Sequence, residues 1–298
     1  MQRRNFIKNT AFCAVAVSAS GFVRFNGSSF EGNCETTTDI LGPFYRPGSP
    51  VRNNLTIKGE AGNIISLSGV IRHNDCKTPY KNAKIELWHC DSEGKYDNTS
   101  TAFRYRGTTY ADEKGHYAFT TILPVPYEAG GGLTRPAHFH LMITAKGYQP
   151  LVTQLYFSGD SHIGKDPYAS SASAKSRVLT VQKLPNGTNK VVYDVGMSEL
   201  LPVEAATIDK LIGVYTDATD KKKTISFFKK ENTIWMKNEA FGNKFQYVGN
   251  NVFEEANNPP GYYWRLQFEF KTTGGIQLNE SYVDNDLIKH DAVYLKKS

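Results

Sequence analysis

The sequence predicts an all-β protein, with an antiparallel β-sandwich followed by a small antiparallel β-barrel of the lipocalin-like kind. Short runs of alternating apolar and polar residues recur along the chain, and clusters of Gly, Pro, Asn and Asp separate them. This is the pattern of strands joined by turns. The 17 Tyr and 17 Phe among 298 residues are also typical of β structure. No long stretch of helical periodicity interrupts the pattern, so we expect few helices.

The β-sandwich is expected over residues 31–202. Its strands are predicted in the runs NIISLSGVIRH (63–73), AKIELWHC (83–90), GHYAFTTIL (115–123), HFHLMITA (138–145) and LVTQLYFSG (151–159). Turn-forming residues lie between these runs. Many short strands with few helices favour an antiparallel sandwich or barrel.

A second unit, the β-barrel, is expected over residues 203–298. PVEAATIDKL (202–211) predicts a short helix at the boundary. Beyond it, strands are predicted in KTISFFKK (223–230), TIWMK (233–237), KFQYV (244–248), YYWRLQFEFKTT (262–273), GIQLNESYV (275–283) and AVYLKK (292–297). Close spacing of such strands is typical of a compact antiparallel barrel. This unit contains no pattern to which we assign chemistry.

Residues 1–30 have the composition of an export signal. Arg3 and Arg4 precede an apolar core, from Ala11 to about Ala19, that is shorter than the roughly 20 apolar residues needed to span a bilayer. The run RRNFIK resembles the twin-arginine export motif. We therefore expect a periplasmic protein without a stable membrane span. An ordinary amphipathic N-terminal helix is the alternative.

The positive charge of the chain gives little support for nucleic-acid binding. The formal net charge is +6, and four of the positive charges, on Arg3, Arg4, Lys8 and Arg24, lie in residues 1–30, which contain no acidic residue. The rest of the chain is nearly neutral and shows no cluster of basic residues interleaved with aromatic ones. We expect no nucleic-acid partner.

Three cysteines remain beyond the export signal, namely Cys34, Cys76 and Cys90. In an oxidising compartment they are compatible with one disulfide and one free thiol. Three reduced, buried thiols are equally compatible with the sequence. None of them forms a CxxC pair, so cysteine-based metal binding has no support.

The pair His138-x-His140 is the first candidate for a metal site. On a strand, both imidazoles project from the same face, because side chains alternate with a period of two. Taken alone, the pair is equally compatible with two metal ligands and with two bystander histidines. The sequence has no Asp or Glu between Glu128 and Asp160, so an iron site of two His and one carboxylate would need a distant carboxylate.

Two turns of similar sequence each lead to a tyrosine. They are Asp91-x-x-Gly94-x-Tyr96 and Asp112-x-x-Gly115-x-Tyr117. Each combines a turn Asp with a Gly that can adopt a positive φ. His89 and His116 adjoin these turns, and we expect both on the surface.

Five segments, in order along residues 40–168, together resemble the intradiol ring-cleavage dioxygenases, which open catechols. They are ILGPFYRPGSP (40–50), IELWHCDSEGKYDN (85–98), FRYRGTTYADEKGHYAFTTILPVPY (103–127), RPAHFHLMI (135–143) and TQLYFSGD (153–160). Any one segment is weak evidence, but five in family order are not easily accidental.

The resemblance implies a set of functional residues. The family's iron(III) ligands fall on Tyr96, Tyr127, His138 and His140, and a hard trivalent ion favours phenolate oxygens. Tyr127 matches the tyrosine that leaves the metal and takes a substrate proton. Arg135 matches a cation that stabilises charge on the ring, and Gln154 matches a glutamine on the oxygen-binding side. Gly42, Pro43 and Tyr45 are expected at the mouth of the pocket, and Tyr117 is expected to be an ordinary strand residue.

The resemblance also implies the reaction, in which O2 cleaves the bond between the two hydroxylated carbons of a catechol to give a cis,cis-muconate. The resemblance does not identify the particular catechol. It also leaves open whether the chain forms a homo-oligomer. The loops near residues 40–52, 72–80 and 99–110 are expected to select the substrate. Two alternatives are a non-catalytic transthyretin-like or carbohydrate-binding sandwich, and an enzyme such as a redox-silent hydrolase that uses the same ligands with another metal.

Overall fold

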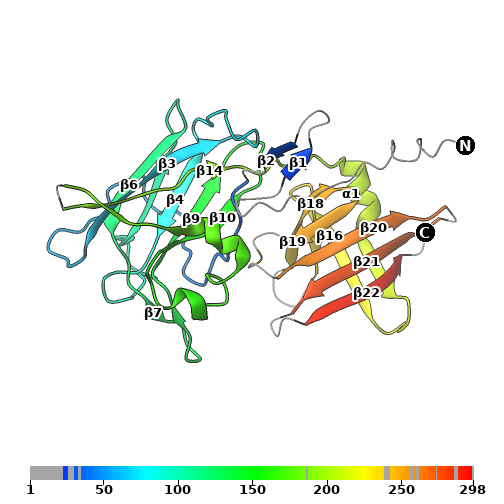
Figure 1. The fold of residues 1–298 in the computed structure, drawn as a ribbon. Coiled ribbons are helices and arrows are strands. Elements are labelled where there is room, and N and C mark those ends of the chain that lie inside the picture. The colour runs from blue at the N-terminus through cyan, green and yellow to red at the C-terminus, as the bar shows by residue number, and fades with distance from the viewer. Residues whose placement is uncertain are drawn as a thin grey trace, which may run out of the picture.

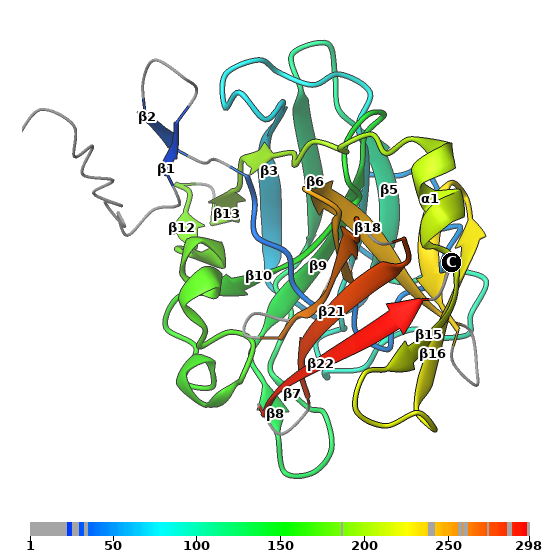
Figure 2. The same cartoon turned by 90° about the vertical axis from the view of Figure 1, so that its right-hand side faces the viewer.

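A computed structural model describes residues 23–25, 30–32, 35–185, 187–237, 242–255, 258, 262–272, 274–284 and 288–296. It confirms the predicted fold class, because a β-sandwich lies beside a closed antiparallel β-barrel (Figure 1). Figure 2 views the molecule from the barrel side. Most of the predicted export signal lies outside the described residues. At its end, β1 (Val23–Phe25) pairs antiparallel with β2 (Phe30–Gly32).

Two sheets form the sandwich. The first has the strand order β11-β10-β9-β4-β5, and the second has the order β12-β13-β3-β14 with β6 also paired to β3. The first sheet contains β4 (Lys84–Trp88), β5 (Arg106–Tyr110), β9 (His138–Thr144), β10 (Leu151–Phe157) and β11 (Val178–Leu179). The second contains β3 (Ile64–Arg72), β6 (His116–Ile122), β12 (Gln182–Lys183), β13 (Asn189–Val192) and β14 (Val195–Gly196).

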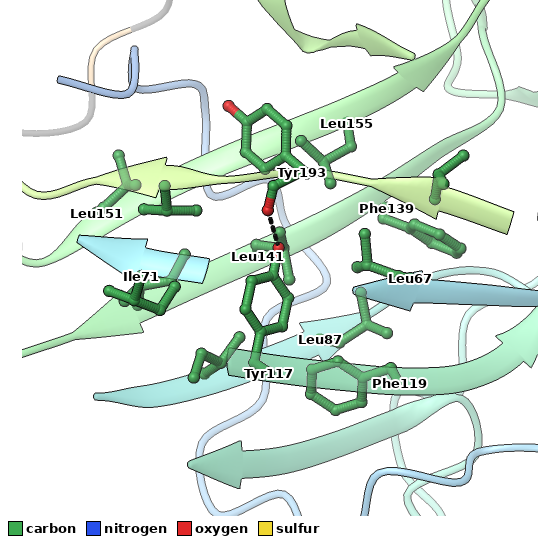
Figure 3. Close-up of a cluster of buried hydrophobic side chains, with 14 of the residues drawn as sticks. Leu67, Ile71, Leu87, Tyr117, Phe119, Phe139, Leu141, Leu151, Leu155 and Tyr193 are labelled. Carbon is green, nitrogen blue, oxygen red and sulfur yellow. Dashed lines mark hydrogen bonds between the residues drawn. The ribbon is translucent and has the colours of Figure 1, made fainter. Parts of the chain in front are cut away.

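A hydrophobic core fills the space between the two sheets. Strand β9 contributes Phe139, Leu141 and Ile143, and other strands contribute residues such as Leu67 and Leu87 (Figure 3). Because side chains alternate along a strand, His138 and His140 project from the opposite face of the first sheet. The outer face of this sheet, and not the space between the sheets, therefore carries the predicted metal ligands.

Residues before β3 run along this outer face and tie down its strands. The backbone N–H of Asp39 donates to the Val152 carbonyl at 2.9 Å, and that of Arg52 donates to the Thr108 carbonyl at 2.9 Å. Other short elements surround the site: β7 (Tyr127–Glu128), β8 (Thr134–Arg135) and the 3-10 helices η1 (Ile163–Lys165) and η2 (Ala172–Arg177).

The barrel has a hydrophobic core of its own. Its strands are β15 (Gly213–Asp217), β16 (Thr224–Lys230), β17 (Thr233–Met236), β18 (Asn243–Gly249), β19 (Val252–Glu255), β20 (Trp264–Phe270), β21 (Ile276–Val283) and β22 (Lys289–Lys296). Antiparallel pairing of β15 with β22 closes the barrel. Leu266, Phe268 and Leu278 fill it, and helix α1 (Ala205–Leu211) adds Ile208 and Leu211 to the same core.

Several local expectations can be compared with the structure. Strand β5 lies entirely within residues 99–110, for which the sequence predicts a loop. Its outward-facing residues Arg106 and Thr108 are buried but polar, so the strand shows no apolar alternation.

Cys76 is disulfide-bonded and Cys90 is free and buried. No described helix is long and apolar enough to cross a membrane.

His89 corrects the expectation of a surface histidine, because only 1% of it is exposed. Its Nδ1 lies 2.7 Å from the Cys90 carbonyl and its Nε2 lies 2.7 Å from the Thr121 hydroxyl. Both ring nitrogens are thus satisfied inside the protein, which is how a polar residue tolerates burial. His116, by contrast, is exposed.

Candidate metal centre

A tight turn places Tyr96 in the site. The Asp91 carboxylate accepts hydrogen bonds from the backbone N–H groups of Glu93 and Lys95, both at 2.9 Å. Gly94 adopts a φ of +79°, and a Cβ added there would lie 2.9 Å from the Cβ of Tyr127. The turn needs glycine both for its conformation and for this close approach. Tyr96 and Tyr127 are held together as a result, with ring centroids 5.4 Å apart.

The two histidines meet these tyrosines from the outer face of β9. The Nε2 atoms of His138 and His140 lie 3.2 Å apart. The Tyr96 hydroxyl lies 3.2 Å from Nε2 of His140 and 3.5 Å from Nε2 of His138. The ring of Tyr127 lies beside that of His138, with centroids 5.7 Å apart. The structure thus brings all four predicted ligands together.

The protonation states of the four side chains suit metal binding. Burial, reinforced by the charge of Arg135, lowers the pKa of His138 to about 3. Burial and the neighbouring His138 hold the pKa of His140 well below its ordinary value. Both imidazoles are therefore neutral, with a lone pair available. Burial raises the pKa of Tyr96 and of Tyr127, so these hydroxyls need a bound cation in order to ionise.

The donor set fits one hard metal ion. Atoms that each lie about 2.0–2.1 Å from a common ion are separated by roughly the 3.2–3.5 Å observed among the His and Tyr96 donors. Nδ1 of His138 donates to the Pro136 carbonyl at 2.6 Å, which leaves Nε2 as the free ligand atom. In the described part of the chain, no three His, Cys, Asp or Glu side chains gather to hold a metal, so a metal at this point would need the tyrosine oxygens as ligands.

Aromatic side chains support the ligands. The Trp88 ring stacks on His140, with centroids 4.8 Å apart and an interplanar angle of 7°. Phe44 stacks on Tyr96 with centroids 4.2 Å apart. These contacts fix the ring orientations and keep water away from one side of the site.

The predicted pocket mouth lies against this aromatic layer. Gly42 has a φ of +72°, and a Cβ added there would lie 3.2 Å from Cε1 of His140. Tyr45 packs on Trp88 with centroids 5.1 Å apart. Burial and the Glu86 carboxylate raise the pKa of Tyr45 to about 12. Pro43 lies in the turn between Gly42 and Tyr45.

Arg135 is held on three sides. Its Nε donates to Asp166 at 2.6 Å and its Nη2 donates to Oε1 of Gln154 at 2.8 Å. The Tyr168 ring covers its guanidinium face at 4.8 Å. Burial is the largest single influence and lowers the pKa of Arg135, but Asp166, Tyr156 and Tyr127 together outweigh it and raise the pKa. The guanidinium is therefore a fixed, permanent cation whose Nη1 has no hydrogen-bond acceptor among the described residues.

Both the oxygen and the nitrogen of the Gln154 side-chain amide form hydrogen bonds within the protein. Its Oε1 accepts from Arg135, and its Nε2 donates to the Ile40 carbonyl at 2.8 Å. The structure thus gives Gln154 a role in holding Arg135. Tyr117, as expected, is a core residue, and its hydroxyl donates to the Tyr193 carbonyl at 2.7 Å (Figure 3).

Several residues that surround the predicted ligands and Arg135 receive no role from the sequence motifs. They are Phe44, Trp88, Tyr156, Asp166 and Tyr168. The alternation on β10 could have revealed one of them, because Tyr156 is two residues from Gln154 and shares its face. Asp166 gives no such signal, because it lies in an irregular segment after β10 and becomes a neighbour of Arg135 only in the folded chain.

Comparisons with known proteins place this site in context. A family model described as a dioxygenase matches residues 40–198, which is more than half of the chain. The chlorocatechol 1,2-dioxygenase of Rhodococcus opacus is 35% identical over 172 residues, which cover 50% of this chain and 66% of that protein. The catechol 1,2-dioxygenase of Pseudomonas sp. strain EST1001 is 32% identical over 151 residues, which cover 44% of this chain and 50% of that protein. The chain thus spans between about half and about two thirds of the length of these relatives.

Solved structures show the same likeness. The 3-chlorocatechol 1,2-dioxygenase of Rhodococcus opacus 1CP superposes with a TM-score of 0.51 at 26% identity, covering 56% of this chain and 74% of that one. The catechol 1,2-dioxygenase of Acinetobacter sp. ADP1 gives a TM-score of 0.51 at 26% identity, covering 57% of this chain and 64% of that one. The family match falls on the sandwich, which also carries the four-donor site.

Proposed function

Because the chain belongs to the intradiol ring-cleavage dioxygenases, we propose that it binds one Fe(III) ion and opens a catecholic ring with O2. Tyr96, Tyr127, His138 and His140 would hold the ion. The bond between the two hydroxylated carbons breaks and each of these carbons gains one oxygen atom, so the product is a cis,cis-muconate. The observation that carries the proposal is the convergence of two neutral imidazoles and the Tyr96 hydroxyl on one point, with the half-buried Tyr127 ring packed beside them.

When bound, the ion would be chelated by the two catechol oxygens and would supply Lewis acidity that makes a ring carbon reactive toward O2. The protein supplies the rest. The Tyr127 side chain can accept a proton from the substrate, because its oxygen is a phenolate while it is a ligand. The fixed cation of Arg135 stabilises negative charge that develops on the ring. Trp88 and Phe44 hold His140 and Tyr96 in place and exclude water from their side of the site.

The substrate class we propose is a simple catechol, with or without small ring substituents. The named relatives act on catechol and on chlorocatechol. We also propose, from the twin-arginine-like run RRNFIK, that the protein is exported to the periplasm. Export after folding would suit a protein whose ligands come from separate elements and must be assembled before the metal is bound.

The test uses the full-length protein loaded with iron. We expect a visible charge-transfer band from the tyrosinate ligands, a change of this band on adding catechol, and consumption of one O2 for each catechol in an oxygen-electrode assay. A panel of substituted catechols in the same assay would define the substrate. A colourless, inactive protein after iron loading would overturn the proposal.

Two conservative variants test the ligand assignment. Tyr127→Phe should alter the visible band and slow turnover, because it removes one phenolate. Tyr117→Phe is the matched control, since it removes a buried tyrosine hydroxyl from the core and should leave the band unchanged. If the two results were exchanged, the family assignment would stand but the ligand set would be wrong.

A further inference from the structure

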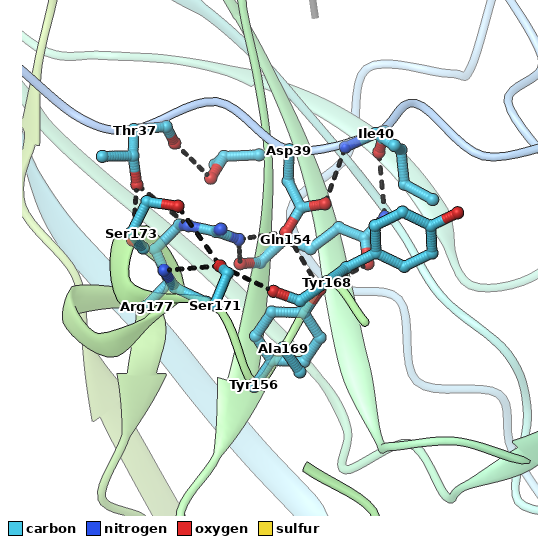
Figure 4. Close-up of polar contacts among 12 residues, drawn as sticks. Thr37, Asp39, Ile40, Gln154, Tyr156, Tyr168, Ala169, Ser171, Ser173 and Arg177 are labelled. Atoms are coloured by element: carbon cyan, nitrogen blue, oxygen red, sulfur yellow. Dashed lines mark hydrogen bonds and ion pairs between the residues drawn. The ribbon is translucent and has the colours of Figure 1, made fainter. Parts of the chain in front are cut away.

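A buried polar network extends from Arg135 along β10, beside the predicted ligands, and the Tyr156 ring lies 5.8 Å from that of His138. Figure 4 shows the part of the network around Tyr156. Its members are at most 5% exposed, and they come from segments far apart in the sequence. They are Asp39, Arg135, Gln154, Tyr156, Asp166 and Arg177. The network contains two guanidinium and two carboxylate groups, so its formal charge is zero. Only part of it touches the site directly.

Tyr156 occupies the centre of this network. Its hydroxyl donates to Oδ2 of Asp39 at 2.9 Å and lies 3.1 Å from Oε1 of Gln154. Nη2 of Arg135 lies 3.5 Å from the same hydroxyl. A single oxygen atom therefore connects the Arg135–Gln154 pair with a second ion pair deeper in the protein.

The second ion pair joins Asp39 to Arg177. Nη1 of Arg177 forms a short contact with Asp39 and donates to the Gln154 carbonyl at 3.0 Å. The backbone N–H of Ile40 donates to Oδ1 of Asp39 at 2.7 Å, while the Ile40 carbonyl accepts from the Gln154 amide. Both the backbone and the side chain of Gln154 are thus fixed from this side.

Such a network is costly for the protein to maintain. Removing charged groups from water costs several kcal/mol for each ion, and a packed apolar cluster could fill the same space. Moreover, Nη2 of Arg177 is buried and has no hydrogen-bond partner among the described residues. A stabilising role alone accounts poorly for this arrangement, whereas orientation of a neighbouring polar group accounts for it directly.

We propose that Tyr156 and the Asp39–Arg177 ion pair are positioning residues that aim the Arg135 guanidinium at the substrate through Gln154. They fix the Gln154 amide so that its oxygen faces Arg135, while Asp166 and Tyr168 hold the opposite edge and one face of the same guanidinium. Nη1 is then left to face the reacting ring. The catalytic part of this inference rests on the proposed function, whereas the positioning part concerns the protein alone.

The kinetic test is a double-mutant cycle between Tyr156 and Arg135 in the iron-loaded enzyme. Tyr156→Phe should lower kcat by about 10- to 100-fold, as expected for a misplaced catalytic group, with a much smaller change in KM and the same visible band. In an Arg135→Lys background, the same substitution should lower kcat by less than about twofold. Phenylalanine keeps the ring that contacts His138 at 5.8 Å, and the hydroxyl that is removed acts through Arg135. Tyr117→Phe is the matched control and should leave kcat unchanged in both backgrounds.

A second readout needs neither iron nor activity. In metal-free, 15N-labelled protein, the Arg135 Nε–H should give a resolved, slowly exchanging resonance because it donates to buried Asp166. Its assignment follows from its loss in Arg135→Lys. Tyr156→Phe and Asp39→Asn should each speed its exchange with solvent, whereas Tyr117→Phe should not.

The outcomes separate the two proposals. If the iron-loaded protein oxidises no catechol, the proposed function is wrong. If Tyr156→Phe still speeds exchange of the Arg135 Nε–H, the positioning role stands. An equal loss of kcat in both backgrounds, or unchanged exchange, would overturn the positioning role and leave the dioxygenase intact. If Tyr156→Phe does not fold, Arg177→Lys replaces it in both experiments, with the same expectations.

Discussion

At the scale of single residues, burial decides what each histidine can do. His138 and His140 were predicted as ligands from their spacing and from the family resemblance, and the structure places them beside Tyr96 and Tyr127. His89 was misjudged because its neighbours along the chain are turn residues. Its burial depends on Thr121, which is 32 positions away, and sequence patterns do not report such long-range partners.

His89 should make the stability of the protein depend on pH. Burial lowers its pKa to about 4, against about 6.5 in an unfolded chain. Between these values only the unfolded state binds the proton, so stability should fall by about 3 kcal/mol as the pH falls from about 6.5 to 4. His89→Gln should remove this contribution.

The measurement is urea unfolding of the wild type and of His89→Gln at several pH values, both without iron. The difference between their unfolding free energies should change across that pH window and be constant above it. Tyr117→Phe provides the control. Burial holds the pKa of Tyr117 well above its ordinary value, so this hydroxyl does not titrate in the window and the variant should run parallel to the wild type. Parallel curves for His89→Gln as well would show that the buried imidazole does not titrate as expected.

At the scale of elements, alternation predicted β3, β4, β6, β9 and β10 to within one or two residues, but not the short strands β11 to β14. The run 63–73 contains β3 (Ile64–Arg72), and the run 138–145 contains β9 (His138–Thr144). The sequence pattern did not predict strand β5, because its outer face is polar and is covered by the segment before β3. The two turns that share a sequence also look equivalent until the fold places Tyr96 in the site and Tyr117 in the core.

These twin turns allow a matched pair of substitutions. Gly94→Ala and Gly115→Ala both place a Cβ at a positive φ, +79° and +74° respectively, which costs roughly 1–2 kcal/mol for an ordinary residue. A Cβ at Gly94 would also press on Tyr127, whereas one at Gly115 would lie 2.6 Å from the Ile71 carbonyl. Both variants should be destabilised, but only Gly94→Ala should weaken iron binding.

Thermal unfolding and iron titration of the two metal-free proteins would check this expectation. The difference in iron affinity between the two variants is the informative quantity, because both variants carry the same backbone cost of a positive φ. Equal iron affinity in both variants would mean that the contact between Gly94 and Tyr127 does not position the ligand.

At the scale of the whole molecule, the sandwich and the barrel have separate hydrophobic cores. Between them lies the interval from the end of β14 at Gly196 to the start of helix α1 at Ala205. The purpose of the barrel was not predictable, since its strands show no chemical motif. None of the side chains described above at the metal centre or around Arg135 comes from it.

A core substitution in the barrel should therefore leave the chemistry intact. Phe268 is 1% exposed and packs against Tyr215, Phe227 and Phe253. Phe268→Ala should cost about 3–5 kcal/mol of barrel stability while oxygen uptake at low temperature stays close to the wild-type value. Phe119→Ala, in the sandwich core, should instead reduce the temperature at which activity is lost.

Two probes distinguish the units during heating. Trp235 and Trp264 lie in the barrel, so tryptophan fluorescence reports mainly on that unit, and residual oxygen uptake reports on the sandwich. Loss of activity in step with barrel melting in Phe268→Ala would show that the barrel is needed for the site.

Strand β9 carries two sets of side chains, one on each face of its sheet. Its odd-numbered residues Phe139 and Leu141 are sealed into the core, and its even-numbered residues His138 and His140 look onto the site. A chain that pairs β9 one residue out of register would bury imidazoles in the core and present phenylalanine to the metal. The correct pairing of β9 is therefore required both for the core and for the proposed metal site, and a copy with this register error would be misfolded and unable to assemble the site.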